Sequence, residues 1–233
     1  MKKIKIFTQN LYWMDFLNKT RRMREVRKYI KSKGFNLVFL QEAVLYLDVK
    51  IVKRKNFAYY DKGRLGPKGG LAILSKKELD KIEFYKFEEQ GSLFNRQLTD
   101  RLIEKGFLVG YIENKIFINT HLICLYGKKS GENVKNLNKQ FEQLFNFVKE
   151  KIKEGKKIIL GGDFNFKRSS KNYKKITKLL TDNTIPLKSR INQKNSKQID
   201  FIFSSEKNSK NYTQPIYPIF VSDHAGIGIE LIS

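Results

Sequence analysis

The chain has 233 residues, of which 40% are hydrophobic, and 47 Lys and Arg against 23 Asp and Glu give a formal net charge of +24. One cysteine excludes an intramolecular disulfide, two histidines with one cysteine exclude a zinc site of the usual composition, and no apolar run is long enough to span a membrane. We therefore expect a single domain over residues 1–233, a monomer, and a polyanionic partner such as nucleic acid or an anionic membrane surface.

The N-terminal segment has a strand–helix–strand pattern. Residues 3–10 form a short apolar run after a basic start, which is too short for an export signal, so we expect a cytoplasmic protein. A helix is predicted over residues 19–33, with apolar residues at helical spacing and Gly34 just past its end. Residues 36–42 then form an apolar strand that ends in a carboxylate. This unit predicts that the first two strands are parallel.

Strands at short intervals follow in the middle of the chain. They are predicted over residues 57–60, 70–75, 82–87, 106–113 and 115–120, with Asn114 in a tight hairpin between the last two. A long amphipathic helix over residues 131–154 follows, and Gly155 closes it.

The stretch 157–166 combines a buried strand with polar residues at its end. Asp163 and Asn165 lie one residue apart, so an extended backbone places both side chains on one face at the carboxyl end of the strand. Gly161 and Gly162 allow a ligand or another backbone to approach closely. Taken alone, this Asp-x-Asn pattern is also typical of an ordinary turn.

The remaining elements complete an α/β fold. A basic helix is predicted over residues 169–180, and strands over 199–204, 216–221 and 225–232. Helices separated by runs of strands indicate a four-layer α-β-β-α sandwich, in which two mixed sheets pack face to face with helices outside.

Positive charge is concentrated directly after the Asp163–Asn165 segment. Between Phe166 and Gln198 the only acid is Asp182, whereas ten residues are basic: Lys167, Arg168, Lys171, Lys174, Lys175, Lys178, Lys188, Arg190, Lys194 and Lys197. Codon bias in an AT-rich genome would also enrich lysine, but it would not explain this concentration. The stretch therefore favours a nucleic-acid interface.

Polar residues recur where the predicted strands end or begin. Each of them alone is compatible with a structural role, such as a solvated strand end or a hydrogen-bonded histidine. Both histidines of the chain, however, stand in such positions together with acids and amides. The set comprises Asn10, Glu42, His121, Asp163, Asn165, Asp200, Asp223 and His224.

The order of these motifs resembles a known superfamily. Thr-Gln-Asn10, Leu-Gln-Glu42, Asn-Thr-His121-Leu, Gly-Asp163-Phe-Asn165, Ile-Asp200-Phe and Ser-Asp223-His224 are similar to motifs of the endonuclease/exonuclease/phosphatase superfamily, the metal-dependent phosphodiesterases related to DNase I. The motifs run from residue 10 to residue 224, so the resemblance covers nearly the whole chain.

The resemblance implies a role for each of these positions. Glu42 is the expected main Mg²⁺ ligand, with Mn²⁺ as an alternative ion, and Asn10 and Asp223 are expected close to the metal. Asp163 is expected to orient or deprotonate the attacking water, and Asn165 to hydrogen-bond the scissile phosphate. His224, oriented by Asp200, and His121 are expected to face the phosphate. The general base is left open between these groups.

The substrate is less closely defined than the chemistry. Tyr12 stands where abasic-site nucleases commonly have Asp, and His121 stands where they tend to have Tyr, so the site looks closer to DNase I and the sphingomyelinases. The segment 100–106 also resembles the sphingomyelinase-like branch. Six residues are candidates for substrate contact: Tyr12, Arg96, Arg101, Lys167, Arg168 and Lys171.

These observations favour a nuclease or DNA-end-processing phosphodiesterase, with DNA preferred over RNA. The alternatives are a sphingomyelinase-like or small-molecule phosphodiesterase or phosphatase, and a non-catalytic nucleic-acid binder. The complete set of acids, amides and histidines argues against the non-catalytic binder, which would not need them.

Overall fold

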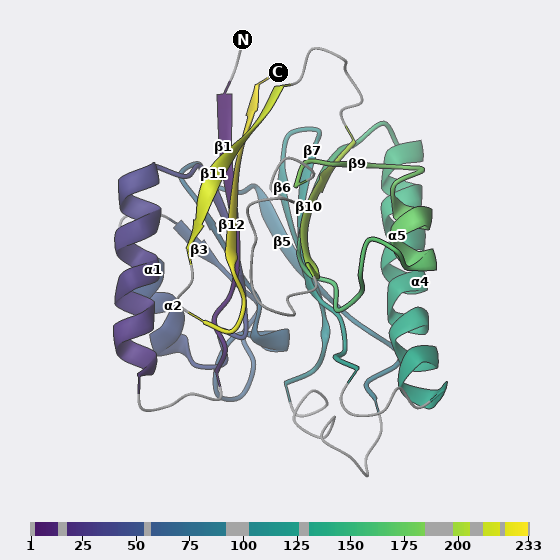
Figure 1. The fold of residues 1–233 in the computed structure, drawn as a ribbon, viewed down its shortest axis with the longest axis horizontal. Helices are drawn as coiled ribbons and strands as arrows, with labels where there is room; N and C mark the ends of the chain where they lie inside the picture. Colours follow the sequence, from purple (N-terminus) through teal and green to yellow (C-terminus); the bar gives the residue numbers. More distant parts are fainter. Residues whose placement is uncertain are drawn as a thin grey trace.

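The computed structural model describes residues 3–13, 18–53, 57–91, 103–125, 131–184, 198–205, 212–219 and 222–232. Two six-stranded mixed sheets pack face to face, and helices lie on the outer face of each (Figure 1). The predicted four-layer α-β-β-α arrangement is confirmed. In the described part of the chain, no helix has the length and apolarity needed to cross a membrane.

The first sheet has the strand order β11-β12-β1-β2-β4-β3. The predicted parallel pairing of β1 with β2 is confirmed, and the other neighbours are antiparallel. The elements of this half are β1 (Lys3–Asn10), α1 (Lys19–Lys33), β2 (Leu37–Gln41), α2 (Tyr46–Lys53), β3 (Phe57–Tyr59), β4 (Ala72–Ser75), β11 (Tyr212–Ile219) and β12 (Gly226–Ile232).

The second sheet has the order β5-β6-β7-β8-β10-β9. Here β7 and β8 are parallel, and the other neighbours are antiparallel. The elements of this half are β5 (Lys81–Lys86), β6 (Gly106–Ile112), β7 (Lys115–His121), α4 (Gly131–Lys153), β8 (Lys157–Asp163), α5 (Lys171–Ile176), β9 (Thr181–Asp182) and β10 (Asp200–Ser204). Each parallel pair is thus joined by a helix that covers its own sheet (Figure 1).

Successive side chains of a central strand point to opposite faces of its sheet, one toward the core between the sheets and the next toward the helices. In β2, Leu37 and Phe39 face the core between the sheets, whereas Val38 and Leu40 face the helices of the first half. Because both faces of such a strand are buried, its sequence is continuously apolar rather than alternating. The central strands are therefore packed on both faces, and the residues at their ends directly follow this packed region.

Two glycines permit close contact between the layers next to Asp163. A Cβ atom on Gly161 would lie 2.5 Å from the Phe39 ring of the other sheet. Gly162 has φ 140°, and its Cβ would lie 2.0 Å from the carbonyl oxygen of Thr120. The close approach predicted from these glycines is therefore made by a side chain and a neighbouring backbone of the protein itself.

Several boundaries differ from the sequence predictions. The helix α2 was not predicted, because its apolar and charged residues also fit a strand pattern, and β9 was not predicted because it has only two residues. The basic helix is shorter than predicted, spanning Lys171–Ile176. Strand β4 begins after Gly70, because Gly69 and Gly70 adopt positive φ in a short 3₁₀ turn. Strand β11 begins at Tyr212, ahead of the predicted start.

Candidate active site

The candidate residues gather at one end of the two parallel strand pairs. Asn10 ends β1, Glu42 follows β2, and His121 and Asp163 end β7 and β8 as register partners. Asp200 begins β10 directly opposite Asp163, and His224 precedes β12. Residues far apart in the sequence therefore meet where the carboxyl ends of parallel strands meet.

Asn10 connects the two sheets at this end. Its buried Nδ2 donates to Glu42 Oε1 at 3.0 Å and to Asp163 Oδ2 at 3.1 Å. Its Oδ1 accepts from the backbone N–H of Tyr12 at 2.9 Å. One amide thus fixes the separation of a carboxylate on the first sheet from a carboxylate on the second.

Three residues at this end adopt positive φ without being glycine. They are Tyr12 (φ 49°), Glu42 (φ 55°) and Asn165 (φ 50°), and each follows the carboxyl end of a central strand. Non-glycine residues in this region each cost about 1 kcal/mol or more, and they persist where surrounding contacts hold them. Here the backbone N–H of Asn165 donates to Asp163 Oδ1 at 2.9 Å, which stabilises the turn.

The oxygen atoms at and around Glu42 suit a divalent cation. Glu42 Oε2 accepts from the backbone N–H of Trp13 at 3.0 Å, and each carboxylate oxygen keeps a further lone pair. Desolvation raises the pKa of Asp223, the charge of His224 opposes this rise, and the charge of Glu42 adds to it. Oxygen atoms of Glu42, Asn10 and Asp223 are the kind of ligands that a hard divalent cation prefers.

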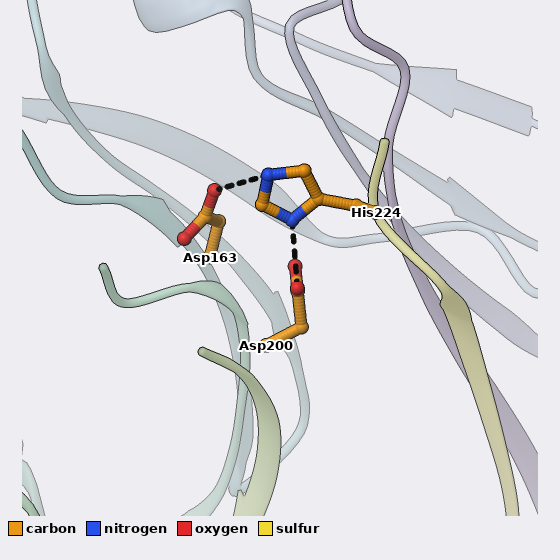
Figure 2. Close-up of side chains that lie close together, drawn as sticks. All are labelled: Asp163, Asp200 and His224. Carbon is orange, nitrogen blue, oxygen red and sulfur yellow. Dashed lines mark hydrogen bonds and ion pairs between the residues drawn. The ribbon is translucent and has the colours of Figure 1, made fainter. Parts of the chain in front are cut away.

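His224 lies between two carboxylates (Figure 2). Its Nδ1 is 2.8 Å from Asp200 Oδ2, and its Nε2 is 3.7 Å from Asp163 Oδ2. Burial alone would lower the pKa of His224, but the charges of Asp200 and Asp163 outweigh it and hold that pKa well above its usual range. Ligand atoms of Asp163, Asp200 and His224 are close enough to one another to share a metal ion.

Asp163 and His121 are buried in the centre of the site. Burial raises the pKa of Asp163, with Asp200 adding to the effect and His224 opposing it. His121 Nε2 lies 3.5 Å from Asp163 Oδ2 and 4.0 Å from Glu42 Oε1. Burial holds the pKa of His121 well below its usual range, and the charges of Lys105 and His224 lower it further. The site thus pairs a neutral histidine with a cationic one.

Backbone contacts fix the loop that carries Asp223 and His224. Ser222 Oγ donates to the carbonyl oxygen of Asn10 at 2.9 Å and accepts from the backbone N–H of His224 at 3.0 Å. Asn165 is held similarly, because its Nδ2 donates to the Leu122 carbonyl oxygen at 2.8 Å. One N–H of that amide remains available for a substrate.

The predicted substrate-contact residues that the structure describes lie in different environments. Tyr12 lies beside Asn10, and Lys171 is exposed at the start of α5. The guanidinium of Arg168 forms an ion pair with Asp182 and also hydrogen-bonds Gln198, Thr184 and Tyr173. These internal contacts favour a structural role for Arg168 over the predicted substrate contact. Lys167 is half-buried, and Arg96 and Arg101 lie outside the described residues.

The comparison with protein families shows which family the chain belongs to. The model described as the endonuclease/exonuclease/phosphatase family matches residues 7–224. The chain belongs to this family. It is accordingly a metal-dependent phosphoesterase.

Several solved structures share the fold at low sequence identity. TDP2 from Caenorhabditis elegans is 19% identical, with a TM-score of 0.73 over 99% of this chain and 75% of that one. Sphingomyelinase C from Streptomyces griseocarneus is 15% identical, with a TM-score of 0.72 over 99% of both chains. A D. rerio TDP2 complexed with a single-strand DNA product is 17% identical, with a TM-score of 0.68 over 100% of both. No curated protein sequence matches the chain.

Two buried residues behind the phosphoesterase site belong to segments quoted from the sequence but were not among the predicted site residues. Lys105 is fully buried, and its charge acts on His121. Asn119 crosses between the sheets, where it accepts from Gln41 Nε2 at 2.6 Å and donates to the carbonyl oxygens of Leu40 and Ala72. The available signals were a lysine directly before an apolar strand and an asparagine within one.

Replacing Lys105 by methionine is expected to lower kcat by about tenfold, or about 1.4 kcal/mol of transition-state stabilisation. The substitution keeps the apolar stem of the side chain but removes a buried positive charge beside the site of an anionic transition state. Steady-state hydrolysis, with circular dichroism as the test of folding, measures the effect. The exposed Lys139→Met is the control, and equal kcat values in the two variants would contradict the role of Lys105.

Proposed function

We propose that the chain is a Mg²⁺-dependent phosphodiester hydrolase that acts on nucleic acid, preferring DNA to RNA, as a nuclease or DNA-end-processing enzyme. The observation that carries the hydrolytic part is the cluster in which Asn10 holds Glu42 and Asp163 together while His224 lies against Asp163 and Asp200. The preference for nucleic acid is supported by the net charge of +24. The DNA product bound by a structural neighbour is consistent with it.

The residues of the site have complementary tasks in this reaction. Water loses a proton as its oxygen adds to phosphorus, the bond to the leaving oxygen breaks as that oxygen gains a proton, and negative charge on the phosphoryl oxygens must be neutralised. Glu42, with Asn10 and Asp223 close by, would hold a Mg²⁺ ion, and that ion would supply part of the positive charge. Asp163 accepts a hydrogen bond from the attacking water, which positions its oxygen. His224 donates its Nε2 proton, and Asn165 an amide proton, to the phosphate oxygens.

A lipid phosphodiester is the second candidate substrate, because apolar side chains are exposed next to Glu42. Leu45, Leu47 and Leu65 are 37%, 55% and 70% exposed. Leu45 and Leu65 belong to adjoining loops, since a Cβ on Gly66 would lie 2.9 Å from the Leu45 Cα. Such a surface suits contact with a lipid layer at the entrance to the site.

A side-by-side assay distinguishes these substrates. The purified protein is incubated with plasmid DNA, a single-stranded oligonucleotide, RNA and sphingomyelin vesicles, in each case with Mg²⁺ and with excess EDTA. We expect cleavage of DNA that EDTA abolishes. Sphingomyelin hydrolysis without DNA cleavage would replace the first candidate by the second, and EDTA-resistant turnover would contradict the metal requirement.

Reversing charge along α5 is expected to weaken DNA binding. Lys171, Lys174 and Lys178 are exposed on or directly after this helix, whereas Lys175 is paired with Glu142 and is left unchanged. Changing the three exposed lysines to Glu should lower affinity and reduce the slope of log K against log salt by up to about three phosphate contacts. Fluorescence anisotropy at several salt concentrations measures both.

The matched control for α5 places the same charge change on α1. Arg24, Arg27 and Lys31 are exposed on that helix, so changing them to Glu alters the net charge equally. Equal losses in the two triple variants would show a general charge effect and would contradict an interface on α5.

A further inference from the structure

The two sheets leave a cavity at the end of the sandwich opposite the phosphoesterase site. It has a volume of about 200 Å³ and is lined by the starts of β1, β2, β7 and β8 and by the ends of β4, β6, β10 and β12. Asp163 lies at the other end of β8, six residues from Lys157, or about 20 Å along an extended strand. The cavity is therefore separate from the catalytic groups.

The inner wall of this cavity is apolar. Ile4, Leu37, Phe117, Ile159 and Leu231 line it, and all belong to the core between the sheets or pack against it. Ile4 and Ile159 are only partly buried, because the packed core ends here without a covering element among the described residues. An apolar group that filled the space would remove this surface from water.

The rim of the cavity is strongly basic. It carries one acid, Glu113, and five lysines: Lys3, Lys76, Lys77, Lys115 and Lys157. Lys3 pairs with Glu230, whereas Lys77 and Lys115 have no ion-pair partner among the described residues. Abundant lysine in the chain does not explain this rim. The groove along α4 is lined by four glutamates and two lysines: Glu88, Glu89, Glu142, Glu150, Lys135 and Lys139.

We propose that this cavity binds an amphiphile with a short apolar chain and an anionic head group, a carboxylate or a phosphate. The apolar wall accommodates the chain, and the lysine rim, chiefly Lys77 and Lys115, attracts the head group. A single water molecule needs about 10–15 Å³ of such space, so the cavity has room for a chain of several carbons. Free nucleic acid fits less well, because its phosphates would reach the rim but leave the wall uncovered. The proposal does not depend on the substrate of the catalytic site.

Calorimetric titration of the full chain tests both parts of the proposed ligand. The probes are decanoate and decyl phosphate below their micelle concentrations, with decanol as the uncharged chain and inorganic phosphate as the free anion. We expect one site per chain for the two anionic amphiphiles and at least tenfold weaker binding of decanol and of phosphate. No binding of either anionic amphiphile, or equal binding of decanol or of phosphate, would overturn the proposal.

Variants locate the binding site. Lys77→Glu with Lys115→Glu should weaken binding at least tenfold by reversing the rim charge, and Ile159→Trp should do so by filling the cavity. Lys135→Glu with Lys139→Glu, in the α4 groove, is the charge-matched control and should bind as the unmodified protein does. The surface charge variants keep the test valid if Ile159→Trp fails to fold. Unweakened binding in the Lys77/Lys115 variant, or an equal loss in the control, would show that the ligand lies elsewhere.

Discussion

Glu42→Gln is expected to reduce metal-dependent hydrolysis by about 10³-fold while the protein remains folded. Removing the proposed main charged ligand of the metal should cost about 4 kcal/mol of transition-state stabilisation. The neutral amide has almost the same shape, but its single oxygen can accept from only one of the two donors that Glu42 now satisfies, Asn10 Nδ2 and the Trp13 N–H. The loop after β1 should therefore loosen locally without loss of the core.

Mg²⁺ titrations separate this effect from general damage. Glu42→Gln should raise the Mg²⁺ concentration needed for half-maximal activity and lower kcat, and circular dichroism should show an unchanged fold. The control is Glu25→Gln, which removes a carboxylate that pairs with Lys28 on the surface of α1. Full turnover by Glu42→Gln at the same Mg²⁺ concentration would rule out the proposed metal site.

His224→Gln is expected to lower kcat by about 10²- to 10⁴-fold, the usual range for a positioned proton donor. The carboxylates of Asp200 and Asp163 hold the pKa of His224 well above its usual range, so the wild-type site presents a cationic donor that a neutral amide does not replace. KM should change less than kcat, because the donor is needed most where charge grows on the phosphate. Single-turnover rates of folded variants measure this.

A double-mutant cycle with Asp200→Asn tests how the effect arises. Asp200 is hydrogen-bonded to His224 at 2.8 Å, and the role proposed for it acts through that residue. Asp200→Asn should therefore slow the unmodified protein but have little further effect on His224→Gln. Multiplicative losses would show that the two residues act independently and would contradict the role given to Asp200 as the group that orients and charges His224.

Local signals in the sequence were sufficient for most of the fold. Helix α1 spans Lys19–Lys33 as predicted, because its apolar residues recur at helical spacing and Gly34 directly follows its last residue. Helix α2 escaped prediction, since its start depends on Asp48 Oδ2 accepting from the backbone N–H of Leu45 and on a buried ion pair with Lys19 of α1. Such a partner 29 residues away in the chain leaves no periodic signal near the helix.

The site was predictable as a set of residues but not as a geometry. The order of the motifs predicted that Glu42, Asp163 and His224 belong to one site. The hydrogen bonds that join Asn10 to both Glu42 and Asp163 depend on how the two sheets pack. For Arg168, the position in the sequence and the contacts in the structure point to different roles. Its position in a basic run suggested a substrate contact, but its guanidinium forms an ion pair with Asp182, the single acid of that run.

The position of β1 has a consequence for how the protein is made. This strand lies between β2, which follows it closely in the chain, and β12, which spans residues 226–232. During synthesis, β1 and β2 can pair early, but the other edge of β1 stays open until the ribosome has released β12. That same event delivers His224 to the site. The nascent chain should therefore remain without activity, and dependent on protection of an exposed strand edge, until nearly all of these residues have emerged.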